Sequence, residues 1–319
     1  MPINPTIGFW FYLVPLVPSI LCSIFVLYHL LTQRALRNAV NNHVVILMLS
    51  FGLLYEITDI VWYIHFYRTG TPIWATETFC RVWVFIDGAV YVIIALLMAW
   101  ASIERHILIF HSTWVATKLQ RFFLHYLPLI IACMYPTVFY GAIFFVIPCD
   151  VWYTYNLATC NQYACISWKP SLSLWDSTAN YIAPVFVIVI FSVALLARVV
   201  YHRCRVRGRV EWRNYRKMAV QLLAISAIYF VFLLPPTILS TAYTAGLPWD
   251  DSEYYYTALY FGYYTVLLTP FVCTVSLPEL RSKGKRLFCC QRERAVGPAS
   301  TISNKRNGTH VVPLTPVKW

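Results

Sequence analysis

The stretch CRVWVFIDGAVYVIIALLMAWASIERHILIF, residues 80–110, decides the fold class of this chain. It is almost wholly apolar, and it exceeds the roughly 20 residues that an α-helix needs to cross the hydrocarbon core of a bilayer. Its acidic residues are Asp87, near one end, and Glu104, near the other. Because a charge within a membrane span is costly, such residues are candidates for function. The stretch predicts a membrane helix with a candidate site near each end.

Six further apolar stretches reach a similar length. The seven predicted spans are Ile7–Leu31, His43–Phe66, Cys80–Phe110, Phe122–Ile147, Thr178–Tyr201, Met218–Tyr243 and Tyr254–Ser276. The composition agrees, since 59% of the residues are hydrophobic and 12% are charged, whereas soluble domains are about 25% charged. We therefore expect an all-α membrane protein, a bundle of seven transmembrane helices over residues 1–290. A disordered cytoplasmic tail is expected over residues 291–319.

The basic residues predict how the bundle is oriented. Of the 25 Lys and Arg residues, 22 fall in the first, third and fifth connections or in the tail. The opposite side has only Arg68, Arg81 and Lys169. Since basic residues favour the cytoplasmic side, we expect the N-terminus outside and the C-terminus inside. The net charge of +12 thus reflects membrane topology, and no nucleic-acid partner is expected.

Cys80 and the triplet Glu104-Arg105-His106 stand at opposite ends of the third predicted span. Asp87 and Arg105 are 18 residues apart, which is five helical turns, so they share one helix face about 27 Å apart. In these features the chain resembles the rhodopsin-like (class A) G-protein-coupled receptors. Those receptors have a cysteine at the outer end of this helix and an Asp/Glu-Arg-Tyr triplet at its inner end. Here His106 replaces the tyrosine.

Two later segments extend the resemblance. Pro235-Pro236 looks like the family's kink proline in the sixth helix. The stretch Thr269-Pro270-Phe271-Val272-Cys273 resembles a degraded Asn-Pro-x-x-Tyr motif in the seventh. The resemblance implies a switch for G-protein coupling that is built from Glu104, Arg105, His106, Pro235, Pro236, Thr269, Pro270 and Cys273. Leucine replaces the usual tryptophan before the kink proline, and Thr269 and Cys273 replace the family's Asn and Tyr.

Asp87 stands where amine receptors of this family place the aspartate that pairs with a ligand ammonium. The resemblance implies a ligand site made of Asp87, Trp83, Tyr91, Asp176 and Tyr263. A buried carboxylate needs a partner, which would be Tyr263, a cation or Arg81. Two interpretations stay open: Asp87 is a ligand anchor, or it is a structural acid capped by Tyr263 and water. Asp176, Asp250, Asp251 and Glu253 form a negative outer mouth that favours cationic ligands.

Four cysteines fall on the predicted outer side, where disulfides form: Cys80, Cys149, Cys160 and Cys165. Four cysteines allow three pairings. The family resemblance ties the third helix to the second outer loop, which favours Cys80–Cys165 with Cys149–Cys160. Cys80–Cys160 is the alternative.

Residues 277–290 follow the seventh predicted span. Four basic residues and several apolar ones predict a short amphipathic helix on the anionic inner leaflet. The adjacent Cys289 and Cys290 predict palmitoylation.

The function that the resemblance implies is transduction of an extracellular cationic signal, an amine or a basic peptide, to a heterotrimeric G protein. Arrestin and membrane lipids are further expected partners, at the plasma membrane. A seven-helix transporter or channel without G-protein coupling is the alternative, although no inverted repeat is seen. Retinal chemistry is excluded because no lysine occurs from Tyr243 to Ser276. No enzymatic activity, cofactor or metal site is expected.

Overall fold

The computed structural model describes residues 4–110, 112–115, 117–149, 152–167, 169–205, 223–224, 226–239 and 260–276. Within this part of the chain all regular structure is helical. Five helices are long and apolar enough to cross a membrane: Pro5–Thr32, Asn42–Thr69, Glu77–Leu108, Lys118–Val146 and Pro170–Arg198. They coincide with the first five predicted spans, so the prediction of an all-helical chain with membrane-length helices is confirmed for the described residues.

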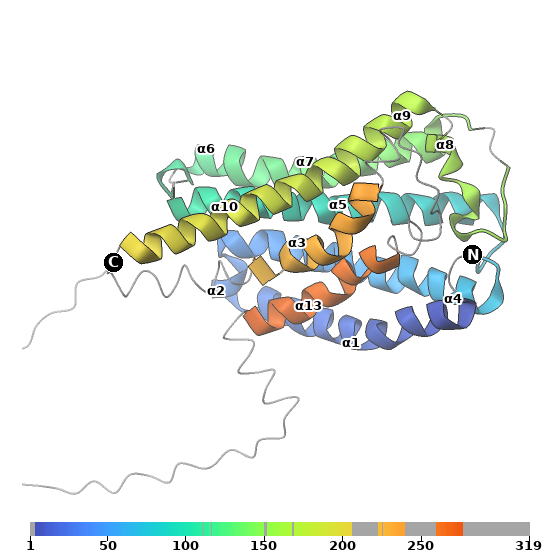
Figure 1. Ribbon diagram of the computed structural model, residues 1–319, viewed down its shortest axis with the longest axis horizontal. Helices are drawn as coiled ribbons and strands as arrows, with labels where there is room; N and C mark the ends of the chain where they lie inside the picture. Colours follow the sequence, from blue (N-terminus) through green and yellow to red (C-terminus); the bar gives the residue numbers. More distant parts are fainter. Residues whose placement is uncertain are drawn as a thin grey trace, which may run out of the picture.

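The elements are numbered in Figure 1. In chain order they are α1 (Pro5–Thr32), α2 (Arg34–Arg37), α3 (Val40–Tyr55), η1 (Glu56–Ile60), α4 (Val61–Thr69), α5 (Glu77–Phe110), η2 (Ser112–Val115), α6 (Lys118–Arg121), η3 (Phe122–Tyr126), α7 (Leu127–Gly141), η4 (Ala142–Val146), η5 (Ala158–Asn161), α8 (Ala164–Ser167), α9 (Pro170–Trp175), η6 (Asp176–Ile182), α10 (Ala183–Arg205) and α13 (Tyr264–Ser276). A further apolar helix spans Ser226–Leu239. This helix and α13 lie within the sixth and seventh predicted spans, of which other parts fall outside the described residues.

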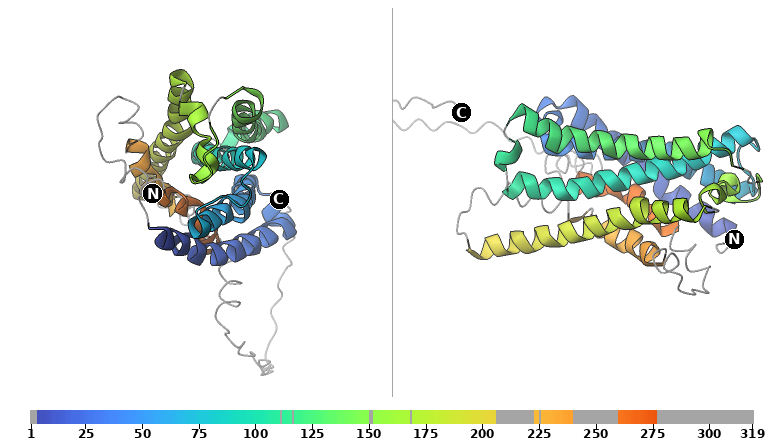
Figure 2. Two further views of the ribbon diagram at one scale, coloured as in Figure 1. Left: turned by 90° about the vertical axis from the view of Figure 1, so that its right-hand side faces the viewer. Right: turned by 90° about the horizontal axis from the view of Figure 1, so that it is seen from above.

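The long helices run side by side along one axis and form a bundle (Figures 1 and 2). The short helices α2 and α6 lie at one end, and α8 and α9 lie at the other end with the start of α1. By the predicted topology, the first end faces the cytoplasm and the second faces outside. We call them the inner and the outer end.

Helix α5 is the central helix. In its most apolar window 72% of residues are buried, against 33% to 50% in the other four long helices. It contacts α3, α7 and α10. A helix with partners on every side is apolar all round, which explains the unbroken apolar run in residues 80–110. Since α5 also carries the candidate sites, those sites lie inside the bundle.

Helix α1 is peripheral and leaves an apolar stripe uncovered. Exposed side chains recur every three or four residues, which is the spacing of one helix face: Ile7, Trp10, Val14, Val17, Leu21, Ile24, Tyr28 and Leu31. In water such a stripe would be unfavourable. Lipid is the solvent that it fits.

Four wide turns with i→i+5 hydrogen bonding interrupt the long helices at η1, η3, η4 and η6. Such turns occur often at functional positions, because the extra residue re-aims the side chains around it. Three of the four carry buried ionisable residues: Glu56 and Asp59 in η1, His125 in η3, and Asp176 in η6.

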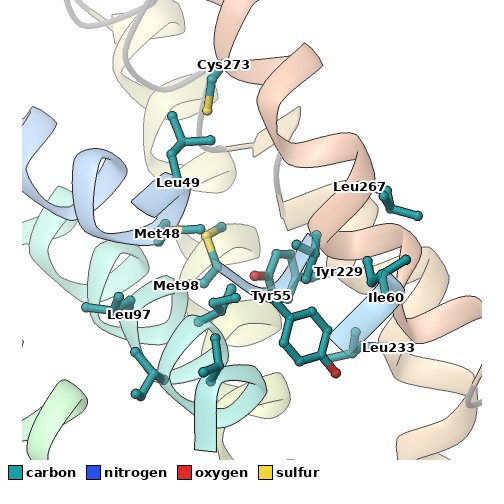
Figure 3. Close-up of a cluster of buried hydrophobic side chains, with 14 of the residues drawn as sticks. Met48, Leu49, Tyr55, Ile60, Leu97, Met98, Tyr229, Leu233, Leu267 and Cys273 are labelled. Carbon is teal, nitrogen blue, oxygen red and sulfur yellow. The ribbon is translucent and has the colours of Figure 1, made fainter. Parts of the chain in front are cut away.

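Side chains from several helices meet in the middle of the bundle. Figure 3 shows Met48 and Tyr55 of α3 with Met98 of α5, Tyr229 of the helix Ser226–Leu239 and Cys273 of α13. All five are buried. The core thus joins the second, third, sixth and seventh predicted spans.

Beside this core, Glu56 links the first and second membrane helices. Its carboxylate accepts hydrogen bonds from Ser19 and, at 3.3 Å, from Ser23 of α1. The Ser19 hydroxyl also lies 2.8 Å from the Leu267 carbonyl of α13. Glu56 is therefore accounted for by hydrogen bonds that join helices, as a buried acid requires.

Candidate functional site

Asp87, the predicted ligand anchor, is 7% exposed and lies toward the outer end of α5. Three tyrosine hydroxyls donate hydrogen bonds to its carboxylate. Tyr55 and Tyr263 reach Oδ1 at 2.7 and 3.0 Å, and Tyr163 reaches Oδ2 at 2.9 Å. The three donors come from α3, from the turn before α13, and from the loop between η4 and α9. One carboxylate thus joins α5 to three other segments.

Asp59 lies beside Asp87, and the two carboxyl groups interact. The indole Nε1 of Trp83 donates to Asp59 Oδ1 at 2.8 Å, and both side chains are fully buried. The other carboxyl oxygen of Asp59, Oδ2, is buried and has no hydrogen-bond partner among the described residues. We call Asp59 and Asp87 the outer acid pair.

The positions of these side chains follow from helical spacing. Tyr55 and Asp59 are four residues apart on the second membrane helix, and Trp83 and Asp87 are four apart on α5. Residues with this spacing are neighbours on one helix face. The two faces meet and exchange hydrogen bonds reciprocally, from Tyr55 to Asp87 and from Trp83 to Asp59. The sequence analysis placed Trp83, Asp87 and Tyr263 in one site, and the structure brings these three together.

From the sequence, Asp59 was assigned no partner, and neither Tyr55 nor Tyr163 was predicted as a site residue. Tyr55 and Asp59 have the same spacing as Trp83 and Asp87. This match could have indicated that Tyr55 bonds Asp87 and that Trp83 bonds Asp59. No signal in the sequence marks Tyr163, because a loop residue has no periodicity that would assign it a neighbour.

The outer loop is held by two disulfides, Cys80–Cys160 and Cys149–Cys165. The favoured pairing of Cys80 with Cys165 was therefore wrong, as was Cys149–Cys160, and the alternative Cys80–Cys160 is the one formed. The contacts of the short helices explain this. η5, which contains Cys160, packs on α5, and α8, which contains Cys165, packs on η4 next to Cys149.

Tyr163 lies between the two loop cysteines and covers Asp87. Burial, and secondly the charge of Asp87, raise the pKa of the Tyr163 phenol well above its usual value. The phenol therefore keeps its hydrogen and serves as a donor. Just before it, Thr159, Cys160 and Asn161 have φ angles of 52°, 54° and 67°. This left-handed conformation costs non-glycine residues about 1–3 kcal/mol each, and the Cys80–Cys160 disulfide restrains the loop there.

The remaining predicted ligand residues, Tyr91 and Asp176, lie around this centre. The Tyr91 ring packs 6.4 Å from Tyr55 and 5.9 Å from Tyr181 between ring centroids. Asp176 accepts hydrogen bonds from Tyr140 at 2.6 Å and from Asn180 at 2.7 Å, so it joins η6 to α7. Asp176 is 7% exposed, so here it is part of a buried network rather than of an open mouth.

Arg81 does not pair with Asp87 as considered above. Its Nε donates to the Tyr153 hydroxyl at 2.7 Å. Asp250, Asp251 and Glu253 lie outside the described residues.

At the inner end of α5, Glu104 forms an ion pair with His125 of η3. His125 Nε2 is in turn 2.9 Å from His43 Nδ1, and His43 Nε2 is 3.0 Å from the Arg37 carbonyl. Glu104 and His125 are 2% and 1% exposed. This relay, which we call the inner histidine relay, connects α5 to the second and fourth membrane helices and to α2.

The hydrogen bonds of the relay constrain where its protons lie. A carbonyl only accepts, so His43 Nε2 carries a hydrogen toward Arg37. A neutral His43 accepts at Nδ1 from His125 Nε2, whereas a protonated His43 donates to it. One further proton lies between His125 Nδ1 and Glu104. The resemblance implied that Glu104 and the adjacent Arg105 belong to one switch. The structure adds His125 as a partner of Glu104.

The two residues after Glu104 are also inside the bundle. Arg105 is 3% exposed, and His106 is 8% exposed. His106 Nε2 lies 2.7 Å from the Phe191 carbonyl of α10, and the two rings pack edge to face at 5.5 Å. His106, which replaces the family's tyrosine, thus joins α5 to α10.

The predicted switch residues of the last two helices are also described. Pro236 is buried in the helix Ser226–Leu239, next to the half-buried Pro235. In α13, Thr269 donates to the Thr265 carbonyl at 2.5 Å, and Cys273 is fully buried. Cys289, Cys290 and the helix predicted over residues 277–290 lie outside the described residues.

No protein-family model and no curated protein matches this chain.

Proposed function

We propose that this chain is a divergent rhodopsin-like G-protein-coupled receptor with seven transmembrane helices in the plasma membrane. In this proposal the helices Ser226–Leu239 and α13 are parts of the sixth and seventh spans. The N-terminus faces outside, and Cys289 and Cys290 carry palmitoyl groups on the cytoplasmic side.

One observation carries the proposal. The most buried helix, α5, has Asp87 with three hydroxyl donors toward one end and Glu104-Arg105-His106 in contact with other helices at the other end. A ligand that donates hydrogen bonds to Asp87 replaces the hydroxyls of tyrosines from other segments and so releases those tyrosines. Those segments then change their packing against α5.

The ligand is a cation, either an amine or a basic peptide, because Asp87 and Asp59 offer carboxylate oxygens and aromatic rings surround them. Binding shifts the population of the bundle toward a state in which the sixth helix bends outward at Pro235-Pro236. The inner end then exposes Arg105 to a heterotrimeric G protein, and arrestin is a later partner.

A G-protein recruitment assay in cells, with biogenic amines and basic peptides as agonists, tests this proposal. We expect at least one agonist to recruit G protein through the wild-type chain, and Asp87→Asn to reduce its potency at least 100-fold. That loss corresponds to about 3 kcal/mol for a buried charge pair. Glu56→Gln is the matched control, because it neutralises another buried acid.

Equal potency in wild type and Asp87→Asn would remove Asp87 as the anchor. Failure of every agonist and of an inner-face-stabilising binder to produce recruitment would overturn the receptor assignment. Ion or solute flux through the purified chain would instead favour a transporter or channel.

A further inference from the structure

The outer acid pair has more acceptors than its surroundings have donors. Asp87 receives three hydroxyl hydrogen bonds, whereas within the described part of the chain Asp59 receives one, from the indole N–H of Trp83. Asp59 is 0% exposed, and its Oδ2 is without a hydrogen-bond partner among the described residues. A buried carboxylate oxygen without a donor is strongly unfavourable.

The groups around the pair do not supply the missing positive charge. Within the described part of the chain, the other ionisable side chains that interact with it are phenols. They are Tyr12 of α1, Tyr55 of α3, Tyr63 of α4, Tyr163 of the outer loop, Tyr181 of η6 and Tyr263 before α13. Arg81, the cation nearest in sequence to Asp87, is bonded to Tyr153.

Two ionised carboxylates that share a buried site repel each other strongly, as in other acid dyads. One proton removes the repulsion and also satisfies the free oxygen. The three hydroxyl donors favour the ionised form of Asp87, whereas Asp59 has a single donor. The proton therefore belongs mainly to Asp59 and forms an O–H···O⁻ hydrogen bond toward Asp87.

We propose that the outer acid pair is a one-proton site, and that a cation with N–H donors binds there by replacing this proton. With one proton the two carboxyls carry a net charge of −1. When an ammonium enters and the proton leaves to water, two carboxylates and one cation again carry −1. The buried charge is unchanged by the exchange, and the ammonium N–H groups take over the donation to both acids. The exchange step rests on the proposed function, whereas the proton in the resting pair does not.

Infrared difference spectroscopy on the full chain in lipid nanodiscs tests the resting proton, because a protonated carboxyl has a C=O stretch that an ionised one lacks. We expect Asp59→Asn to remove one such band. Asp87→Asn should shift that same band, since it changes the hydrogen-bond partner of the Asp59 proton. Glu56→Gln, the control, should leave it in place. Absence of any band sensitive to Asp59→Asn, or a band unmoved by Asp87→Asn, would overturn the proposal.

Methylammonium and tetramethylammonium chloride test the exchange, since both are monovalent but only the first has N–H donors. Methylammonium should diminish the band in the wild-type chain, with an apparent affinity that rises up to tenfold per pH unit where one proton is released. Tetramethylammonium should leave the band unchanged. This wild-type measurement also decides the matter if a variant does not fold. An unchanged band with methylammonium would refute the exchange.

The spectroscopic result is separable from the recruitment assay. A methylammonium-sensitive band together with no G-protein recruitment would support the acid pair while overturning the receptor function. Recruitment without the band would support the receptor function and overturn the acid pair.

Discussion

At Asp87, three tyrosines place three hydroxyls on one carboxylate, and each comes from a different segment. Tyr55 and Tyr263 also stack on each other, with ring centroids 5.8 Å apart. Removing one hydroxyl leaves the ring packing in place and deletes a single donor. These residues are therefore suited to measuring what one hydrogen bond to a buried acid contributes.

Tyr55→Phe and Tyr263→Phe should each lower the stability of the chain by about 1.5–3 kcal/mol, the range for hydrogen bonds to charged groups. The reason is that the buried carboxylate of Asp87 loses a hydrogen-bond donor. The thermal unfolding midpoint in nanodiscs measures this. Tyr28→Phe is the control, because Tyr28 is 63% exposed on the apolar stripe of α1; a fall for Tyr28→Phe as large as for the other two would contradict the prediction.

At the scale of the elements, the long helices could be predicted from the sequence, whereas the partners of the residues in the wide turns could not. The five long helices follow from their apolar runs, and the grouping of Trp83, Asp87 and Tyr263 around the outer acid pair follows from spacing and resemblance. Glu56 and Asp59 are three residues apart, a spacing that places two side chains on neighbouring parts of one face of an α-helix. In η1 they bond partners on different helices, Ser19 of α1 and Trp83 of α5, and spacing along one helix does not report which other helices lie beside it.

The histidines that connect to Glu104 could not be predicted from the sequence either. His43 and His125 are 82 residues apart and are joined only by the packing of the second and fourth membrane helices. No periodicity within one helix reports on such a contact. The disulfide pairing was mistaken for a similar reason, since it depends on which short loop helix packs on α5.

The inner histidine relay gives a prediction about how these helices are held together. His125→Phe leaves Glu104 buried without its charged partner, and we expect a loss of about 3–5 kcal/mol. His43→Phe removes two hydrogen bonds of the relay, to His125 and to the Arg37 carbonyl, and should cost about 2 kcal/mol, about 1 kcal/mol for each bond.

A double-mutant cycle on thermal stability checks this prediction. Adding Glu104→Gln to His125→Phe should recover part of the loss, because no unpaired charge remains. Strictly additive effects of the two substitutions would contradict it.

At the scale of the whole molecule, the distribution of basic residues and the two disulfides point to the same orientation. The cysteines that pair lie at the end of the bundle with few Lys and Arg residues. Disulfides persist in oxidising compartments, which agrees with an outer location for that end.

Engineered glycosylation acceptors test the orientation. Ala158→Thr converts Asn156-Leu157-Ala158 of the outer loop into an acceptor sequence, and Asn156 is exposed. We expect this variant to gain a glycan, seen as a gel shift that glycosidase reverses. Val40→Thr creates an acceptor at Asn38 on the inner side and should gain none. A glycan at Asn38 and none at Asn156 would reverse the topology.

The two disulfides also form a short covalent tether. Cys80 lies near the start of α5, and Cys149 follows η4 at the end of the fourth membrane helix. Only four residues lie between their disulfide partners, Cys160 and Cys165. Those four residues reach at most about 14 Å when fully extended. The outer ends of α5 and α7–η4 are thus held together by one short covalent link. At the outer end the remaining helices can move independently, whereas α5 and α7–η4 move together. Any opening of this end must therefore be a movement of other helices relative to this linked pair.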